Sequence, residues 1–404
     1  MINIAVLGYG TIGSGVVEVI DKNNSSIDRK TGDNIRVKHV LDLRDFPGDR
    51  VESILVHDFD IILNDPEVKI VVEVMGGVEP AYTFVKKCLL AGKSVCTSNK
   101  ELVAAHGPEL IKIAKDKNIN FLFEASVGGA IPIIRPLCSS LTADRILEIK
   151  GILNGTTNYI LTQMDVEGWD FDRALSKAQE LGYAERNPEA DIEGYDACRK
   201  IAILSSLAFG KSVNYEDIYT EGISKITATD IKYAGKMDCK IKLLASSENI
   251  DGKYYAMVAP FLVKSSHPLS GVSGVFNAIF VKGSEIDDVM FYGSGAGKLP
   301  TACAVVADVV DAARHLNENI QTIWSEEGLE LTGSENATRR FFVRVLGKRS
   351  ECEDKIKEEF GAVDFIEIPE DTEGFGFVTP ALAEKSFDTH LANFPNVSGR
   401  IRFE

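Results

Sequence analysis

The first third of the chain alternates between short strand-like runs, most of them rich in apolar residues, and segments with helical periodicity. The strand-like runs are "INIAVLG", "NIRVKHVLDL", "KIVVEVMG", "SVCTS" and "INFLFEAS". Runs without a polar face are typical of strands in a parallel sheet that is covered on both sides. Helical segments such as "PAYTFVKKCLLAGK" and "GPELIKIAKDKN" follow the strands. Because this alternation produces βαβ units, we predict a doubly wound α/β domain over residues 1–135.

The pattern changes at about residue 136. The runs "RILEIKGILN", "YAMVAPFLVK" and "NAIFVKG" resemble strands that are grouped, with long helices between them, which predicts an α+β domain over residues 136–320. The segment "LPTACAVVADVVDAARHL", at about 299–318, is a helix of small residues. Small side chains permit close packing, so we expect this helix to return to the first domain.

The segment from about residue 338 has a plan of its own. "TRRFFVRVLG", "VDFIEIP", "EGFGFVT" and "VSGRIRF" are predicted strands, and the middle two form a hairpin across "PEDTEG". "ECEDKIKEEFG" and "EKSFDTHLANF" are predicted helices, each with apolar residues along one face. The order βαββαβ predicts a small ferredoxin-like domain over residues 338–404.

Composition and charge exclude several classes of protein. The chain has 404 residues, of which 45% are hydrophobic and 26% charged, as in a soluble globular enzyme. Its net charge of −16 disfavours binding to nucleic acid or to an anionic membrane surface. We recognise no run long enough to span a membrane and no signal peptide. Seven scattered cysteines favour a reduced, cytoplasmic protein, and the six isolated histidines make a histidine metal site improbable.

A glycine motif lies between the first strand and the first helix. Gly8, Gly10 and Gly13 form GxGxxG in "GYGTIG". The first glycine permits the turn, the second lets the backbone approach a pyrophosphate, and the third lets the helix pack on the strand. The alternative is a glycine-rich turn without a ligand, but the strand and helix around it favour a Rossmann-type dinucleotide site.

The second strand ends in "LDLRD", which leaves the choice of cofactor open. Asp42 could accept a hydrogen bond from the free ribose hydroxyl of NAD, and Arg44 could pair with the 2′-phosphate of NADP. A solvated arginine is the third possibility. We favour NADP without excluding NAD.

Two further segments combine charge with a strand end. Lys100 in "TSNKELVA" follows a strand's carboxyl end, where open α/β sheets bind ligands, although a surface lysine near a helix start is the simpler interpretation. Glu124 in "FEASVGGAIPII" precedes a glycine-rich bend that exposes backbone carbonyls. A carboxylate with carbonyls could bind a hard cation, and a strand-to-helix turn is at least as good an explanation.

The segment "ELGYAERNPEADIEGYDACRKIAIL" places an acidic loop directly before an apolar helix. Asp196 and Lys200 lie one turn apart on one helix face, a spacing that usually marks a surface ion pair. A lysine at the edge of a core can instead act as an acid and base that is oriented by a carboxylate. Glu185 and Asp191 in the preceding loop could then hold a substrate ammonium.

Together these segments resemble the homoserine dehydrogenase family from residue 1 to about 320. The matching segments are "GYGTIG", "VVEVMGGVEPA", "TSNKELVA", "FEASVGGAIPII", "GILNGTTNYIL", "LGYAERNPEADIEGYDACRK", "HPLSGVSGVFNAI" and "GSGAGKLPTA". The resemblance implies interconversion of L-homoserine and L-aspartate 4-semialdehyde with NAD(P)H, on the route to threonine, methionine and isoleucine. It also implies a homodimer or homotetramer, with the dimerisation surface in the domain 136–320, and a carboxyl-terminal ACT-like domain.

The resemblance assigns a role to individual residues. Lys200 resembles the general acid and base, Lys100 the second active-site lysine, and Asp196 the carboxylate that orients Lys200. The substrate would be bound by Glu185, Asp191, Asp196 and Thr156. The cofactor would be bound by Gly8, Gly10, Thr11, Ile12, Gly13, Arg44, Ser98, Lys100, Gly182 and Gly297. A structural sodium ion would be bound by Glu124 and the carbonyls of Val127, Gly129 and Ile131.

Two features depart from the family's pattern. The turn "LGKRSECED" lacks the Asp-x-x-Gly of effector-binding ACT domains, which puts feedback by threonine in doubt, and "LDLRD" carries both an acid and an arginine. Two other classes of protein are alternatives. A dinucleotide-sensing regulator would not need Lys200, Asp196 and Glu185 together. A phosphorylating semialdehyde dehydrogenase would need an activated cysteine with a partnered histidine, and no cysteine here lies in such a motif.

Overall fold

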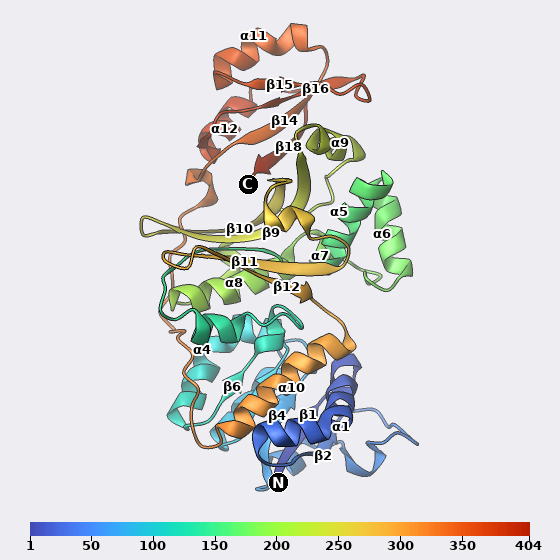
Figure 1. The fold of residues 1–404 in the computed structure, drawn as a ribbon, viewed down its shortest axis with the longest axis vertical. Coiled ribbons are helices and arrows are strands. Elements are labelled where there is room, and N and C mark those ends of the chain that lie inside the picture. Colours follow the sequence, from blue (N-terminus) through green and yellow to red (C-terminus); the bar gives the residue numbers. More distant parts are fainter. The chain divides into compact units, whose positions relative to one another are not determined.

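The computed structural model describes residues 1–404, which form two compact units (Figure 1). The first unit comprises residues 1–145, 202–215 and 291–329, and the second comprises 146–201, 216–290 and 330–404. The chain therefore passes between the units more than once, and each unit is described separately.

A six-stranded parallel sheet forms the centre of the first unit. Its strand order is β3-β2-β1-β4-β5-β6, and every pair is parallel. The strands are β1 (Ile2–Leu7), β2 (Ile35–Leu41), β3 (Leu55–Val56), β4 (Val68–Glu73), β5 (Ser94–Thr97) and β6 (Phe121–Leu122). The order reverses between β1 and β4, as in a Rossmann-type sheet. This arrangement confirms the predicted α/β fold class.

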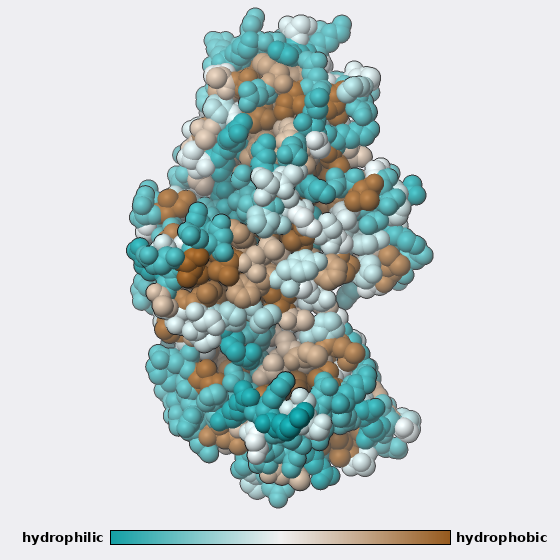
Figure 2. Space-filling view, viewed as in Figure 1, coloured by the Kyte–Doolittle hydropathy of each residue, from teal (hydrophilic) through white to brown (hydrophobic).

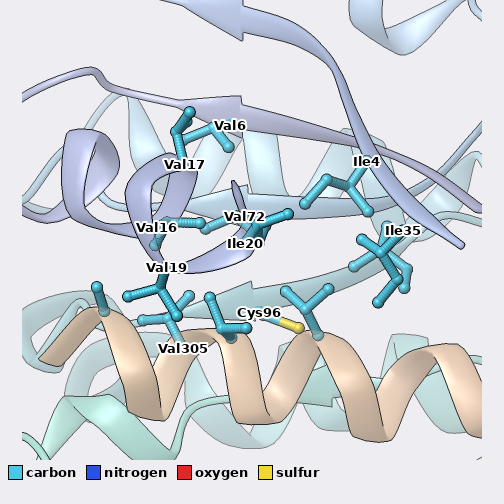
Figure 3. Packing of buried hydrophobic residues seen from close by; sticks show 14 of the residues in the cluster. Ile4, Val6, Val16, Val17, Val19, Ile20, Ile35, Val72, Cys96 and Val305 are labelled. Atoms are coloured by element: carbon cyan, nitrogen blue, oxygen red, sulfur yellow. The ribbon is translucent and has the colours of Figure 1, made fainter. Parts of the chain in front are cut away.

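The helices of the first unit are α1 (Thr11–Thr31), α2 (Phe59–Leu63), α3 (Ala81–Leu90), α4 (Lys100–Asp116) and α10 (Lys298–Arg314). α10 packs against α1 and the sheet, where its small residues allow a close approach: a Cβ added to Gly15 would lie 3.0 Å from the Cβ of Ala302. Val16 and Val19 of α1 and Val305 of α10 belong to the same buried cluster (Figure 3).

Helix α4 begins earlier than the sequence pattern predicts. The dipeptide Gly107-Pro108 looks like a helix start, but the helix begins at Lys100 and Pro108 lies inside it. The reason is a cap: the side chain of Asn99 accepts a hydrogen bond from the N–H of Leu102 at 3.1 Å. The strand predicted from "INFLFEAS" is shorter than expected: β6 ends at Leu122, and a 3₁₀ turn follows.

The second unit contains most of a ten-stranded sheet with the order β12-β11-β7-β9-β10-β18-β14-β16-β15, in which β8 also pairs with β10. Its central strands are β7 (Ile146–Ile152), β8 (Tyr219–Thr220), β9 (Cys239–Ile250), β10 (Lys253–Lys264), β11 (Phe276–Gly283) and β12 (Asp288–Ser294). The long hairpin β9–β10 turns at Asp251 and Gly252, which both have left-handed φ angles. The sequence prediction missed β9 and β12.

The helices associated with these strands are α5 (Gly155–Glu167), α6 (Phe171–Glu180), α7 (Glu189–Ile192), α8 (Tyr195–Phe209) and α9 (Ala228–Lys236). Helix α8 begins in the second unit and ends in the first. One-turn helices occur at Glu52–Ile54, Glu124–Ser126, Pro136–Ser140, Tyr215–Asp217, Pro268–Gly271 and Ser334–Asn336.

The carboxyl-terminal segment has the predicted βαββαβ order. It consists of β14 (Phe341–Leu346), α11 (Arg349–Phe360), β15 (Asp364–Ile366), β16 (Gly374–Val378), α12 (Glu384–Leu391) and β18 (Val397–Phe403), after the short pair β13 (Thr338–Arg339) and β17 (Leu382–Ala383). The antiparallel order β18-β14-β16-β15 is that of a ferredoxin-like sheet. β18 also pairs in parallel with β10, so the ranges 136–320 and 338–404, expected as separate domains, share one sheet.

The remaining global features concern cysteines and surface. All seven cysteines are free thiols. No helix is long and apolar enough to cross a membrane. Figure 2 shows a face on which hydrophilic residues surround smaller hydrophobic areas.

Candidate active site

Asp196 and Lys200 form a buried pair at the start of α8. The Nζ atom of Lys200 lies 2.7 Å from Oδ2 of Asp196 and donates a second hydrogen bond, of 2.8 Å, to the carbonyl oxygen of Leu153. The lysine side chain is 11% exposed and the aspartate 8%. By contrast, the i,i+4 pair of Lys112 and Asp116 is more than 60% exposed at both residues. The Lys200 pair is therefore not a solvated surface pair.

Asn154 connects this pair to a second carboxylate. Its side-chain amide donates to Oδ2 of Asp196 at 3.0 Å and to Oδ1 of Asp191 at 2.7 Å. Its oxygen accepts from the N–H of Thr157 and caps helix α5. Our sequence analysis did not single out Asn154. The signal that could have revealed it is an asparagine at the predicted end of a strand, directly before the helix "GTTNYIL".

Asp191 and Thr156 lie in the same group. The Thr156 hydroxyl is 2.6 Å from the carbonyl oxygen of Tyr183 and 3.2 Å from Oδ2 of Asp191. Burial, and after it the charge of Asp196, raises the pKa of Asp191, while the hydrogen bond from Asn154 opposes the rise. The structure thus brings together four of the predicted residues: Lys200, Asp196, Asp191 and Thr156.

Two other predicted residues lie on the exposed segment after α6. Gly182 has a left-handed φ of 74° and ends the helix by donating its N–H to the carbonyl oxygen of Gln179. Glu185 is exposed, and its backbone carbonyl accepts a hydrogen bond from the Gln179 side chain. The Glu185 carboxylate is therefore open to solvent.

The glycine motif of the first unit forms the turn from β1 into α1. Gly8 has a φ of +95°, and its carbonyl lies where a Cβ on Gly13 would be, so the helix can pack this closely only with glycine. Gly10 precedes the helix, and Thr11 and Ile12 form its first turn. N–H groups at a helix start favour an anion such as a pyrophosphate.

A cavity of about 490 Å³ opens beside this turn. Its lining includes both glycines of the turn, the end of β2 and the start of α3: Gly8, Gly10, Leu41, Asp42, Leu43, Arg44, His57, Phe59, Val74, Met75, Pro80 and Phe84. Apolar side chains with a few polar groups at one end are typical of a nucleotide pocket.

Asp42 and Arg44 form a pair at the polar end of this cavity. The guanidinium donates from Nε and Nη2 to the carboxylate at 2.9 and 3.0 Å, and the backbone N–H groups of Tyr9 and Arg44 also donate to it. The Arg44 hydrogen bonds hold the pKa of Asp42 well below its usual range. Both ring nitrogens of His57 face acceptors, the Asp42 carbonyl and the Asp45 carboxylate, and these hydrogen bonds raise the pKa of His57.

The carboxyl ends of β4 and β5 place Ser98 and Lys100. Glu73 is buried and accepts hydrogen bonds from the Thr97 hydroxyl at 2.6 Å and from the N–H of Met75 at 2.7 Å. Burial raises the pKa of Glu73. Ser98 and Lys100 are half-buried, and Lys100 is the first residue of α4. A buried carboxylate therefore links two loops at the sheet edge where parallel sheets bind ligands.

The glycine-rich bend after β6 encloses the Glu124 carboxylate. This carboxylate accepts the backbone N–H groups of Ile133, Ile134 and Arg135 at 2.6 to 2.8 Å. No group of three or more His, Cys, Asp or Glu side chains that could hold a metal ion occurs in the chain. The predicted cation site of Glu124 with the backbone carbonyls of Val127, Gly129 and Ile131 stays a prediction.

Gly297, the last of the predicted cofactor residues, directly precedes α10. It has a φ of +122°, a conformation that favours glycine. In the same unit, the neighbouring Gly295 approaches Gly129 so closely that a Cβ on Gly129 would overlap its carbonyl. The glycine-rich bend after β6, at Gly129, and the glycine-rich segment before α10, at Gly295, thus pack against each other.

Known proteins resemble this chain over nearly its whole length. The family models described as "Homoserine dehydrogenase, NAD binding domain" and "Homoserine dehydrogenase" match residues 8–124 and 132–310. The chain is 41% identical over 315 residues to homoserine dehydrogenase from Lactococcus lactis, covering 76% of this chain and 73% of the relative.

Solved structures extend the similarity. A homoserine dehydrogenase from Thiobacillus denitrificans, 35% identical, aligns with a TM-score of 0.90 over 100% of this chain and 98% of its own. A hyperthermophilic archaeal homoserine dehydrogenase mutant in complex with NADPH, 29% identical, aligns with a TM-score of 0.66 over 77% and 97%. The chain therefore belongs to the homoserine dehydrogenase family of NAD(P)-dependent oxidoreductases, which act on a CH–OH group.

Proposed function

We propose that Lys200 is the general acid and base of the homoserine dehydrogenase reaction in this enzyme. The observation that carries the proposal is the buried contact of its ammonium with Asp196 and with the Leu153 carbonyl. These two acceptors hold two of the three ammonium hydrogens, which leaves the third for a substrate oxygen. Because the Lys200 side chain is largely removed from bulk water, the remaining N–H donor of its ammonium group is held in one place.

The chemistry follows from the growth of charge on the substrate. Bound NAD(P)H supplies the hydride that adds to the aldehyde carbon of L-aspartate 4-semialdehyde. The carbonyl oxygen then becomes negative, and Lys200 donates a proton to it, which gives the hydroxyl of L-homoserine and a neutral amine. The amine regains its proton from water. In the reverse direction, the neutral amine accepts the hydroxyl proton.

Carboxylates beside Lys200 would hold the other end of the amino acid. Asp191 and Glu185 are the proposed partners of the substrate ammonium, with Thr156 beside Asp191. The half-buried position of Lys100 at a helix start supports its assignment as the second active-site lysine. Binding at both ends would orient the substrate for hydride transfer.

For the cofactor we propose NADP in preference to NAD. Arg44 places a guanidinium at the polar end of the nucleotide cavity, beside the His57 imidazole whose pKa is raised, and a 2′-phosphate would be attracted there. The archaeal relative was solved with NADPH. The remaining cofactor contacts are proposed for Gly8, Gly10, Thr11, Ile12, Gly13, Ser98, Lys100, Gly182 and Gly297.

Further proposals concern sodium, assembly and location. Glu124 and the carbonyls of Val127, Gly129 and Ile131 are a suitable oxygen set for Na⁺. The exposed side chains of Met290 and Tyr292 on the edge strand β12 support a homodimer or homotetramer. Seven free thiols support a cytoplasmic location. An ACT-like role of residues 338–404 is supported by their ferredoxin-like topology.

Replacement of Lys200 tests the central proposal. Because a positioned proton donor contributes roughly 10²–10⁴-fold, Lys200→Ala should lower kcat by about that factor while NADP binding is retained. Lys200→Arg should not restore the rate, since a guanidinium does not release a proton near neutral pH. The measurement is kcat for homoserine oxidation beside a thermal unfolding curve.

Lys112→Ala is the matched control, because Lys112 also has an aspartate four residues away but is exposed. It should leave kcat unchanged. A Lys200→Ala enzyme with near-native kcat would return Lys200 to a structural role. Absence of any homoserine-dependent turnover in the unmodified protein would instead favour a dinucleotide-sensing protein.

A further inference from the structure

We infer that Asn154 is a positioning residue of this active site, whose side-chain amide holds the Asp191 and Asp196 carboxylates in their ionised forms. It donates one hydrogen bond to each, at 2.7 and 3.0 Å, and is itself 6% exposed. The inference rests on the roles proposed above for Lys200, Asp196 and Asp191.

The orientation of the amide is determined by its partners. Oδ1 of Asn154 accepts from the backbone N–H of Thr157 at 2.9 Å, and the Thr157 hydroxyl lies 3.2 Å away. A backbone N–H can only donate, so the amide oxygen must face Thr157. The NH₂ group must then face the two carboxylates, and each of its hydrogens has one acceptor.

The two carboxylates are close enough to repel each other. One nitrogen contacts an oxygen of each, and the charge of Asp196 contributes to the raised pKa of Asp191. A hydrogen bond donated to an ionised carboxylate lowers its pKa. Asn154 therefore opposes protonation of Asp191, which must be ionised to bind an ammonium, and of Asp196, which must be ionised to hold Lys200.

The position of Asn154 in the fold makes its amide rigid. It lies two residues after β7 and is the N-cap of α5, so the amide cannot turn away without uncapping the helix. The preceding residue, Leu153, accepts the Lys200 hydrogen bond through its carbonyl. One dipeptide thus contacts the proposed proton donor and both carboxylates.

Asn154→Ser separates positioning from capping. Serine is a good N-cap but lacks the two N–H donors. We expect kcat/KM for homoserine to fall roughly 10–100-fold at neutral pH, mainly through a higher KM, because two hydrogen bonds to charged groups are lost. With the donor to Asp191 lost, the pKa of Asp191 rises further, so the acidic limb of kcat/KM against pH should move to higher pH.

Two further variants complete the test. Asn154→Asp keeps the volume and the cap but adds a negative charge, so it should move the acidic limb in the same direction. Asn158→Ser removes another buried amide of α5, which donates to the carbonyls of Val272 and Phe276. It should lower the melting temperature and leave the acidic limb where it is.

The outcomes distinguish this inference from the proposed function. An unmoved acidic limb in Asn154→Ser, in an enzyme that Lys200→Ala inactivates, would overturn the positioning role alone. A Lys200→Ala enzyme with near-native kcat would overturn the proposed function whatever Asn154 does. Failure of both Asn154 variants to fold, while Asn158→Ser folds, would show that Asn154 is structural and would also overturn the inference.

Discussion

At the scale of the residue, the pair of Asp42 and Arg44 is the basis of the proposed preference for NADP. The carboxylate accepts four hydrogen bonds, two from the guanidinium and two from backbone N–H groups. A carboxylate has about four acceptor sites, so Asp42 has no site left for a ribose hydroxyl. Arg44 is 62% exposed and uses Nε and Nη2 on Asp42, which leaves the N–H groups of Nη1 for a phosphate.

Replacement of Arg44 by alanine should therefore affect the two cofactors differently. We expect the Kd of NADP to rise roughly 10–100-fold, since charge-assisted hydrogen bonds to the phosphate are lost, and the Kd of NAD to change little. Both constants can be measured by titration of the protein without substrate. Arg50→Ala is the control, because Arg50 is also exposed and paired with an aspartate but does not line this cavity. Equal losses for NADP and NAD would place Arg44 away from the 2′-phosphate.

At the scale of the element, uninterrupted apolar runs predicted strands even where a strand ends in a buried polar residue. β1 and β4 were evident for this reason, although β4 ends in the buried Glu73. β9 was missed because it buries Lys242 and Ser246, which interrupt the apolar pattern. Its turn at Asp251-Gly252 was the available signal, since Asp-Gly favours a two-residue hairpin.

In the candidate site, the sequence predicted the contact between residues that are close along the chain, and it did not predict the contacts between residues that are far apart. The i,i+4 spacing of Asp196 and Lys200 was readable because it is a property of one helix. The contacts of Asn154 with Asp191 and Asp196 span 37 and 42 residues, and no local spacing encodes them. Likewise, the engagement of the Glu124 carboxylate by three backbone N–H groups depends on the return of the chain after the bend.

Strand β18 carries a buried cation that connects three elements. Arg402 is 1% exposed, and its guanidinium contacts Glu384 at the start of α12 and, at 2.6 Å, Glu221 after β8. Its removal would leave the buried Glu384 carboxylate and the half-buried Glu221 carboxylate without their nearest cation, since Arg400 lies farther from both, at 3.6 and 3.9 Å. We expect Arg402→Met to destabilise the protein by about 3–5 kcal/mol, measured by urea unfolding.

Arg340→Met is the matched control for this prediction. Arg340 is 47% exposed, and its partner Asp364 is 82% exposed at 3.6 Å. An exposed pair of this kind contributes at most about 1 kcal/mol. If the two substitutions destabilised the protein equally, the buried network around Arg402 would have no special energetic role.

At the scale of the whole molecule, the carboxyl-terminal segment is part of the second unit rather than an appendage to it. β18 joins β10 in one sheet, and Glu404 beyond β18 pairs with Lys150 of β7 at 2.6 Å. A ligand bound to residues 338–404 would therefore act on elements that share a sheet with β7, after which Leu153 and Asn154 follow. The fold provides a physical connection, so the question of regulation depends on whether this segment binds an effector.

We expect threonine to have little or no regulatory effect on this enzyme. Effector-binding ACT domains commonly carry Asp-x-x-Gly in the first strand-to-helix turn, and here that turn between β14 and α11 is only Gly347 and Lys348. It offers no carboxylate to hold an amino acid's ammonium. Because threonine resembles homoserine, weak competition at the active site is the expected result at millimolar threonine.

Initial rates at several homoserine concentrations, with and without threonine, separate the two sites. Competition raises the apparent KM and leaves kcat unchanged, whereas binding at a separate regulatory site can lower kcat. Lys348→Ala is the companion variant, and it should respond to threonine as the unmodified enzyme does. Strong inhibition that lowers kcat and is relieved by Lys348→Ala would show that this turn binds the effector without the family's motif, contrary to our expectation.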